Sequence, residues 1–469
     1  MIDFTYFLTV FALDIPLSSN YNKINKGNYR EDLTVQIKID LNQKIGKIKN
    51  MNATGQAPMG GGVGENAYNY FHYLSDICVP YVRLHDVGGL FAGNRYVDVP
   101  NIFRDFDADE NDPANYDFAF TDSYIAALYK NGLKPYYRLG VTIENHSEIK
   151  SYRIDPPKDY EKWARICEHI IAHYNEGWAD GFHYGIEYWE IWNESDDGMR
   201  LSMMWNGTAE DYYRLYDVAS KHLKAKFPNI KIGGYAATGF YAISETAEKL
   251  AKNPRHQYFM DFFHGFMKYI KEHGSPLDFF SWHSYSDPRE IVIEGKWVRE
   301  QLIAYGYGNV ESHLNEWNPR SRDFARATGK HAADVAAAML GCQNIDVDML
   351  MIYDARLETT TYSAFFVPST KVAQLSPVYY TFAAFSSLYK LGTQVALECD
   401  TEGVYAVAAS NGKKHALMIS NISGEDKPLA IEGADLSDAR WYLLDDDRLL
   451  SWSPAVKEIK NNTVVLVEF

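Results

Sequence analysis

The stretch Ile186-Glu187-Tyr188-Trp189-Glu190-Ile191-Trp192-Asn193-Glu194 decides the fold. Large apolar and aromatic side chains occupy both faces of residues 186–192, which is typical of a strand buried within a parallel sheet. The run then ends in two polar residues, Asn193 and Glu194. Because active sites of parallel barrels lie at the carboxyl ends of the strands, we expect this strand to deliver a carboxylate there.

Seven further short apolar runs alternate with longer helical patterns, which indicates a parallel sheet with crossover helices. Eight strands is the number of an α/β fold of the (β/α)8 TIM barrel type, and we predict that fold. The expected strands are residues 57–60, 81–84, 135–139, 188–192, 230–233, 279–282, 312–315 and 349–353. The expected helices, which have apolar residues at three- and four-residue spacing, include residues 122–130, 160–174, 209–226, 258–272 and 332–343.

A second, smaller domain is expected at the end of the chain. After about Gly392 the helical patterns give way to short apolar or alternating runs separated by turn-rich segments, which is typical of an antiparallel β-sandwich. The alternating run 36–39 could add a strand from the N-terminal side. We therefore predict an N-terminal segment over 1–50 that contributes strands to the β domain, a catalytic barrel over 51–391 and a β-sandwich over 392–469.

Composition narrows the classes of partner. The chain of 469 residues carries a formal net charge of −16, which disfavours nucleic acid because phosphate binding relies on clustered Lys and Arg. No apolar run reaches the roughly 18 residues of a membrane span, and the apolar run from Met1 has Asp3 where a signal peptide carries Lys or Arg. We expect a cytoplasmic protein without a membrane partner; a homo-oligomer is compatible with the sequence.

A second acidic motif, Leu314-Asn315-Glu316-Trp317, ends another strand-like run. Two carboxylates on the ends of two strands are the minimum equipment of a retaining glycosidase. One carboxyl group must be protonated to give a proton to the leaving oxygen, and the other must be ionised to attack the sugar. Glu194 and Glu316 are therefore the candidate catalytic pair.

Other candidate site residues directly follow the remaining strands. They are His85, Asp86, Glu144, Asn193, His283, Tyr285, Trp317 and Asp354. The four cysteines lack a Cys-x-x-Cys pair, and His169 and His173 lack the Glu of a zinc protease motif. We expect neither a metal nor an organic cofactor.

The stretch 188–194, together with Glu210-Asp211-Tyr212-Tyr213-Arg214-Leu215-Tyr216, resembles the acid/base region of glycoside hydrolase family 39, the β-xylosidases and α-L-iduronidases of clan A. Five other segments are similar in the same order. They are residues 81–85, 133–137, 232–234, 277–285 and 315–318. The resemblance extends over roughly residues 57–390.

The resemblance implies a (β/α)8 barrel with a β-sandwich, with Glu194 as acid/base on the fourth strand and Glu316 as nucleophile on the seventh. It also implies that Asn193 binds the sugar 2-hydroxyl, Tyr285 holds the nucleophile and His85 contacts the non-reducing sugar. The chain departs from the family pattern at Ser195, which often is Pro, and at Trp317 and Pro319 after the nucleophile. These departures leave both carboxylates in place.

The function expected from the sequence is a retaining exo-glycosidase that acts on a small neutral glycoside or oligosaccharide, first of all a β-xyloside. A β-galactoside, a β-glucoside or an α-L-arabinopyranoside is an alternative substrate. A carbohydrate-binding protein that has lost turnover is the alternative from another class, and the presence of both glutamates argues against it.

Overall fold

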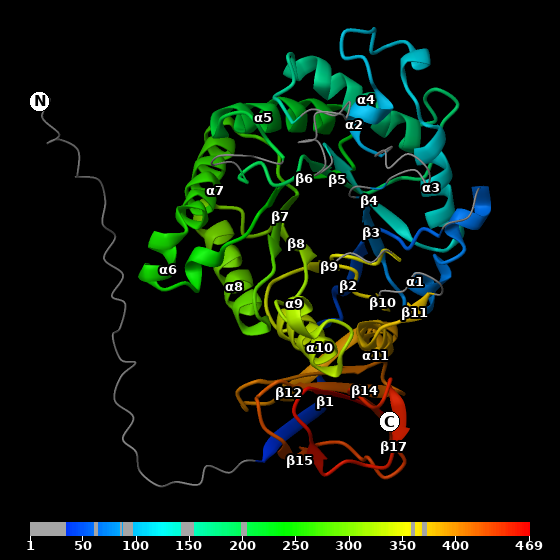
Figure 1. Ribbon diagram of the computed structural model, residues 1–469, viewed down its shortest axis with the longest axis vertical. Helices are drawn as coiled ribbons and strands as arrows, with labels where there is room; N and C mark the ends of the chain where they lie inside the picture. Colours follow the sequence, from blue (N-terminus) through cyan, green and yellow to red (C-terminus); the bar gives the residue numbers. More distant parts are fainter. Residues whose placement is uncertain are drawn as a thin grey trace, which may run out of the picture. The chain divides into compact units, whose positions relative to one another are not determined.

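Eight parallel strands close into a barrel, and helices surround it (Figure 1). The computed structural model describes residues 34–60, 64–84, 87, 97–141, 154–197, 204–357, 362–367 and 373–469. The predicted TIM barrel is thereby confirmed. In barrel order the strands are β2 (Asn50–Gly55), β3 (Tyr81–Leu84), β4 (Lys134–Leu139), β5 (Tyr188–Ile191), β6 (Lys231–Ala237), β7 (Phe279–Ser284), β8 (Glu311–Trp317) and β9 (Met349–Ile352).

The first barrel strand is the one strand of the barrel that the sequence misplaced. We expected it at 57–60, but β2 ends at Gly55. Its polar residues Asn52 and Thr54 are fully buried, and their side chains bond backbone carbonyls, including that of Cys78 at 2.7 Å from Asn52 Nδ2. A strand whose buried polar side chains donate to backbone carbonyls has no apolar run by which the sequence would identify it.

The helices agree with the sequence patterns and extend several of them. α5 has the predicted bounds because Thr208 and Asp211 form a capping box at its start. Among the described residues the helices are η1 (Gly64–Tyr68), α1 (His72–Asp76), α2 (Val99–Ile102), η2 (Pro113–Asn115), α3 (Ala119–Lys130), α4 (Tyr160–Asn175), α5 (Ala209–Lys226), η4 (Tyr241–Ile243), α6 (Ala247–Lys252), α7 (Pro254–His273), α8 (Pro288–Tyr305), α9 (Arg322–Ala325), α10 (Gly329–Gln343) and α11 (Pro377–Leu391). None of these helices is both long and apolar enough to cross a membrane.

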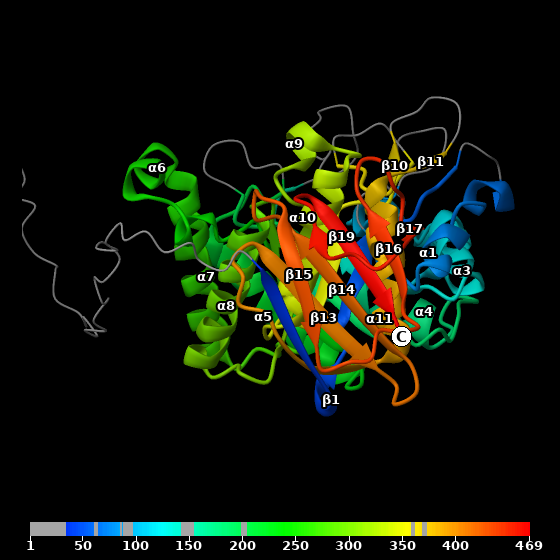
Figure 2. The same cartoon turned by 90° about the horizontal axis from the view of Figure 1, so that it is seen from below.

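A nine-stranded sheet forms the second, smaller domain (Figure 2). It is antiparallel except for the pair β1–β15, and β1 includes the run 36–39. Buried and exposed residues alternate at the start of β1, so the sheet has one apolar face there, whereas β13, β14 and β19 are buried on both faces. In spatial order the strands are β17 (Ser451–Ser453), β16 (Arg440–Leu444), β19 (Thr463–Glu468), β14 (His415–Asn421), β13 (Val404–Ser410), β12 (Thr393–Glu398), β1 (Val35–Lys47), β15 (Lys427–Glu432) and β18 (Glu458–Ile459). A short hairpin of β10 (Phe366–Val367) and β11 (Gln374–Leu375) lies apart from both sheets.

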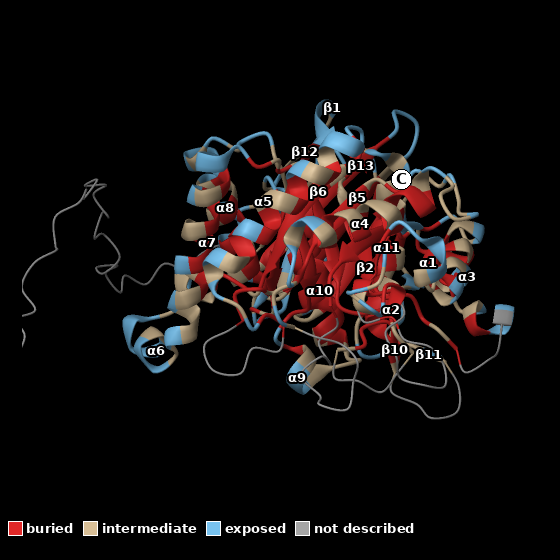
Figure 3. Ribbon diagram, turned by 90° about the horizontal axis from the view of Figure 1, so that it is seen from above, coloured by how far each residue is buried: buried red, intermediate tan, exposed pale blue. Residues whose placement is uncertain are grey.

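Helices α10 and α11 lie between this sheet and the barrel, and α10 is buried along nearly its whole length (Figure 3). Its run of alanines lets neighbours approach closely, and Ser420 of β14 donates a 2.7 Å hydrogen bond to the carbonyl of Ala333. A helix buried on nearly all sides is expected where it packs between two layers, and its few polar residues are paired, as Asp334 is with Lys330.

Inside the barrel, the lining changes from aromatic to charged toward the carboxyl ends of the strands. Tyr81, Tyr136, Tyr188 and Phe279 pack together with Met349 in a buried cluster. Side chains two residues further along a strand point to the same side. The inward-facing positions two residues after these aromatic residues are charged or polar. They are Arg83 on β3, Arg138 on β4, Glu190 on β5 and Ser281 on β7. This polar layer is the floor of the site.

Candidate active site

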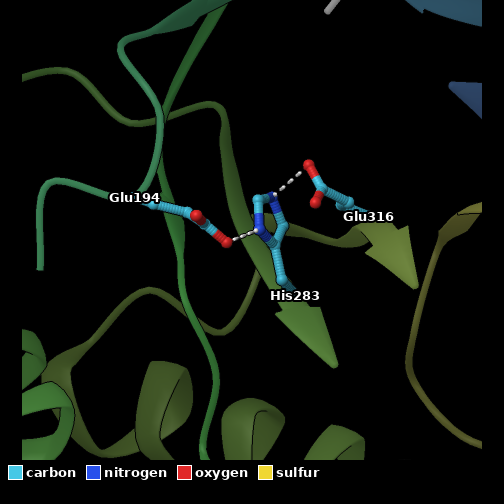
Figure 4. Close-up of side chains that lie close together, drawn as sticks. All are labelled: Glu194, His283 and Glu316. Carbon is cyan, nitrogen blue, oxygen red and sulfur yellow. Dashed lines mark hydrogen bonds and ion pairs between the residues drawn. The ribbon is translucent and has the colours of Figure 1, made fainter. Parts of the chain in front are cut away.

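Glu194 and Glu316 converge at the carboxyl ends of β5 and β8, the fourth and seventh barrel strands (Figure 4). One carboxylate oxygen of each lies within 4.8 Å of the other, and both lie within that distance of a ring nitrogen of His283. Glu316 is 6% exposed and His283 is fully buried. Two strands that are 120 residues apart in sequence thus bring both predicted carboxylates to one point.

His283 lies between the two carboxylates. Its Nδ1 is 2.8 Å from Oε1 of Glu194, and its Nε2 is 3.8 Å from Oε2 of Glu316. The residue points inward because it continues the barrel-facing series of Phe279 and Ser281 on β7. One imidazole therefore faces both members of the pair.

Glu316 accepts hydrogen bonds at both of its oxygens. The hydroxyl of Tyr285 donates to Oε1 at 2.7 Å, and Nη1 of Arg83 donates to Oε2 at 3.1 Å. Burial and the neighbouring Glu316 carboxylate raise the pKa of the Tyr285 hydroxyl well above its ordinary value, so it stays a donor. Hydrogen bonds of this kind favour the ionised form of a carboxyl group.

Arg83 anchors the polar floor beneath the pair. Its Nε donates to Oε2 of Glu190 at 2.8 Å, and its Nη2 donates to Oδ1 of Asn193 at 2.5 Å. Burial lowers the pKa of the guanidinium, but the carboxylates of Glu190 and Glu316 more than offset this and hold it above its ordinary value. Burial raises the pKa of Glu190, yet Arg83 and further donors hold it below the usual range. The Arg83–Glu190 pair is therefore fully charged in the interior.

The backbone around Glu194 is held in an uncommon conformation. Glu194 has a φ of 44°, and its N–H donates to the carbonyl of Ala236 at 3.0 Å. Two residues later Asp196 accepts hydrogen bonds from the N–H and the hydroxyl of Thr238, at 3.0 and 2.7 Å. Left-handed backbone at a residue other than Gly persists only where its surroundings fix it. These links to β6 supply that constraint.

The three facing groups could in principle hold a cation, because their ligand atoms lie within 4.8 Å of one another. However, the guanidinium of Arg83 lies 3.1 Å from Oε2 of Glu316 and Tyr285 already donates to Oε1. A metal ion bound there would face a fixed positive charge, which costs Coulomb energy in a buried site. Glu316 is therefore arranged as an ionised carboxylate bound by Arg83 and Tyr285, and not as a ligand of a metal ion.

Three other predicted site residues, Asn193, Trp317 and Asp354, are buried. Asn193 is buried and is bound by Arg83, and Trp317, the last residue of β8, is fully buried. Asp354 is also buried and forms a 2.6 Å ion pair with Arg356. Three predictions, His85, Asp86 and Glu144, lie outside the described residues.

Sequence reasoning missed Arg83 and Glu190, because only residues that follow the strands were considered. Both residues lie within strands, at positions that face the barrel interior. A signal was present in the sequence: each is a charge two residues after a tyrosine, in a run that is otherwise buried. Charges are almost never fully buried without partners, so such a position indicates a network.

A pocket of about 290 Å³ opens beside Tyr285 at the carboxyl ends of β6, β7 and β8. Its walls carry Tyr241, Ser286, Arg320 and Arg322 in addition to Tyr285. The guanidinium of Arg322 lies 4.4 Å from the centre of the Tyr285 ring. The pocket therefore adjoins the group that binds Glu316.

Two curated relatives match this chain over part of its length. A β-xylosidase from Geobacillus stearothermophilus is 23% identical over 269 residues, which are 51% of this chain and 46% of that protein. A β-xylosidase from Caldicellulosiruptor saccharolyticus is 28% identical over 41% of this chain and 36% of that protein. The matches thus span less than half the length of either relative.

Similarity to solved structures extends over nearly the whole chain. A glucosidase from Croceicoccus marinus has a TM-score of 0.71 at 20% identity, covering 93% of this chain and 99% of that one. At this identity the likeness bears on the fold alone. The sequence profile of "Glycosyl hydrolases family 39" matches residues 36–316, which include both Glu194 and Glu316. The chain therefore belongs to glycosyl hydrolase family 39.

Proposed function

We propose that this protein is a retaining glycosidase, with Glu316 as the nucleophile and Glu194 as the acid/base. The proposal rests on two observations about the carboxyl groups of Glu194 and Glu316: they lie close together, and their surroundings differ. The two carboxyl groups approach within 4.8 Å, which suits the about 5–5.5 Å of retaining enzymes and leaves no room for a water between base and sugar. Glu316 has two donors that favour its ionised form, Tyr285 and Arg83.

The proposed reaction has two displacements. An oxygen of Glu316 attacks the anomeric carbon while the bond to the leaving oxygen breaks, and the proton of Glu194 goes to that oxygen. Glu194, now ionised, takes a proton from water as the water oxygen attacks the same carbon and releases Glu316. Arg83 and Tyr285 bind Glu316 in its ionised state at the start and end of each turnover.

For the substrate we propose a β-xyloside. Both curated relatives are named β-xylosidases, and the family match supports a glycoside as substrate. Glu190 neutralises Arg83 in the floor of the site, so this floor offers no uncompensated positive charge to an acidic sugar. The pocket beside Tyr285 is proposed to receive the leaving group, since Tyr285 lines it and donates a hydrogen bond to Glu316.

A panel of nitrophenyl glycosides tests this assignment. We expect the highest kcat/KM on the β-xyloside, with β-galactoside, β-glucoside and α-L-arabinopyranoside as the competing substrates. The Glu316→Gln variant is the matched control, because it keeps the shape of the site and removes the nucleophile. Faster hydrolysis of another glycoside would replace the β-xyloside as the proposed substrate and would leave the proposed mechanism unchanged. Binding of sugars without hydrolysis of any member would indicate a non-catalytic protein.

A further inference from the structure

Glu294 is a buried carboxyl group that the proposed chemistry does not use. It lies on α8, is fully buried, and contacts the two serines that flank Tyr285. The hydroxyl of Ser284 donates to Oε2 of Glu294 at 2.5 Å, and the hydroxyl of Ser286 donates to Oε1 at 2.8 Å. Both oxygens of one carboxyl group thus hold the residues on either side of the tyrosine that binds Glu316.

This contact reaches the nucleophile in two steps. The serines are adjacent to Tyr285 along the chain, so fixing their side chains fixes the backbone from which the phenol extends. The Tyr285 hydroxyl then donates to Oε1 of Glu316 at 2.7 Å. Backbone hydrogen bonds from Asn318 and Arg320 to the carbonyls of the same two serines tie this segment to the end of β8, which carries Glu316.

The placement of Glu294 is costly for the fold. Burial raises the pKa of its carboxyl group to about 7, although the hydroxyls of Ser284 and Ser286 oppose the shift. An apolar residue of similar size would fill the same space without that desolvation cost. A buried carboxyl group retained at such a cost is therefore a candidate for a role in the site.

We propose that Glu294 is a positioning residue, which holds Tyr285 on Glu316 through Ser284 and Ser286. The inference rests on the proposed function, because its consequence is a nucleophile set in line with the anomeric carbon. Displacement of a reacting group by about 1 Å can cost about 100-fold in rate, so a clamp of this kind has a measurable effect.

A double-mutant cycle on the full chain tests the link. Glu294→Gln keeps the size of the side chain but replaces one acceptor oxygen by a donor. We expect kcat to fall by about 10- to 100-fold with KM within about 2-fold, and the labelling of Glu316 by a 2-fluoro glycoside to slow in parallel. Tyr285→Phe should show a similar loss. In the Tyr285→Phe background, Glu294→Gln should cost less than about a further 2-fold, because the two act as one unit.

Controls separate positioning from general stability. Glu300 lies on the exposed face of the same helix, so Glu300→Gln should leave kcat and the thermal unfolding midpoint unchanged. If Glu294→Gln fails to fold, Ser284→Ala breaks the same link and should give the same loss and the same non-additivity. An equal loss in the Tyr285 and Tyr285→Phe backgrounds, or an unchanged kcat, would overturn the inference while the proposed function stands. A wild-type protein that hydrolyses no glycoside would instead overturn the proposed function, and the inference with it.

Discussion

Nδ1 of His283 lies 2.8 Å from Oε1 of Glu194. On the proposed mechanism this contact fixes the imidazole tautomer at the start of the reaction. A protonated Glu194 donates to Nδ1, which leaves the ring proton on Nε2, the nitrogen 3.8 Å from Oε2 of Glu316. His283 thus binds the acid while it holds its proton, without taking part in bond formation.

Replacement of this imidazole by an apolar ring should disturb Glu194, whose carboxyl group contacts Nδ1. For His283→Phe we expect kcat/KM to fall by about 100-fold, because Glu194 loses the hydrogen bond that orients it. His72→Phe, at an exposed position, is the control and should behave like wild type. A loss below about 3-fold for His283→Phe would show that the contact has no role in turnover.

Glu316→Gln should abolish turnover on every substrate, because the remaining strand-end carboxylates cannot form the glycosyl–enzyme ester. Steady-state rates with an activated aryl glycoside measure this most sensitively. Residual activity above about a thousandth of the wild-type rate exceeds what usually remains when a nucleophile is lost, and would assign the role to another residue.

Glu194→Ala should slow substrates with poor leaving groups far more than activated aryl glycosides, since the latter need little protonation. Added azide should restore the rate and yield a glycosyl azide, because a small anion can fill the space of the missing carboxylate. Equal slowing of both substrate types, without an azide product, would place the acid elsewhere.

The buried carboxyl group of Glu294 also predicts how stability depends on pH. Its folded-state pKa of about 7 lies above the ordinary value of 4.5, so between these values the folded state binds more protons than the unfolded state. The contribution of Glu294 to the free energy of unfolding is therefore fully present below pH 4.5. It is lost as the pH rises to about 7, which lowers the free energy of unfolding by on the order of 2–3 kcal/mol. Asp196, with a pKa raised by burial to about 7, adds a similar slope.

Glu294→Gln removes one of these two contributions. Urea denaturation at pH 5 and pH 8 should show a smaller loss of unfolding free energy for the variant than for wild type. The same loss in both proteins would mean that Glu294 is ionised throughout.

How well the sequence predicted each element follows from what that element buries. Strands such as β5 and β9 bury apolar residues on both faces and stand out in the sequence. β2 buries Asn52 and Thr54 by bonding them to backbone, so its composition resembles that of a loop. β15 begins with Lys427-Pro428 and remains partly exposed, so it is also difficult to recognise as a strand from the sequence.

The same limit applies to the candidate site. Glu194 was predicted because it follows an apolar run, and Glu316 because it follows a shorter, more polar run; each is the second residue of an Asn-Glu dipeptide. Glu294 lies on a helix whose surrounding charges resemble those of a solvent-facing turn, and only the fold places it against Ser284 and Ser286. A contact between a helix and the end of a strand leaves no local pattern in either segment.

The stereochemistry of the product provides the most direct test of the mechanism. The carboxyl groups of Glu194 and Glu316 approach within 4.8 Å, and on the proposed mechanism this spacing excludes a water between the base and the anomeric carbon, so that the sugar passes through an ester with Glu316. Two inversions restore the original configuration, so the first-formed sugar should have the anomeric configuration of the substrate. Proton NMR during the first minutes of hydrolysis, before mutarotation, measures this. An initial product of inverted configuration would require a separation of about 6.5–9.5 Å between the two carboxyl groups and would overturn the proposed roles of both glutamates.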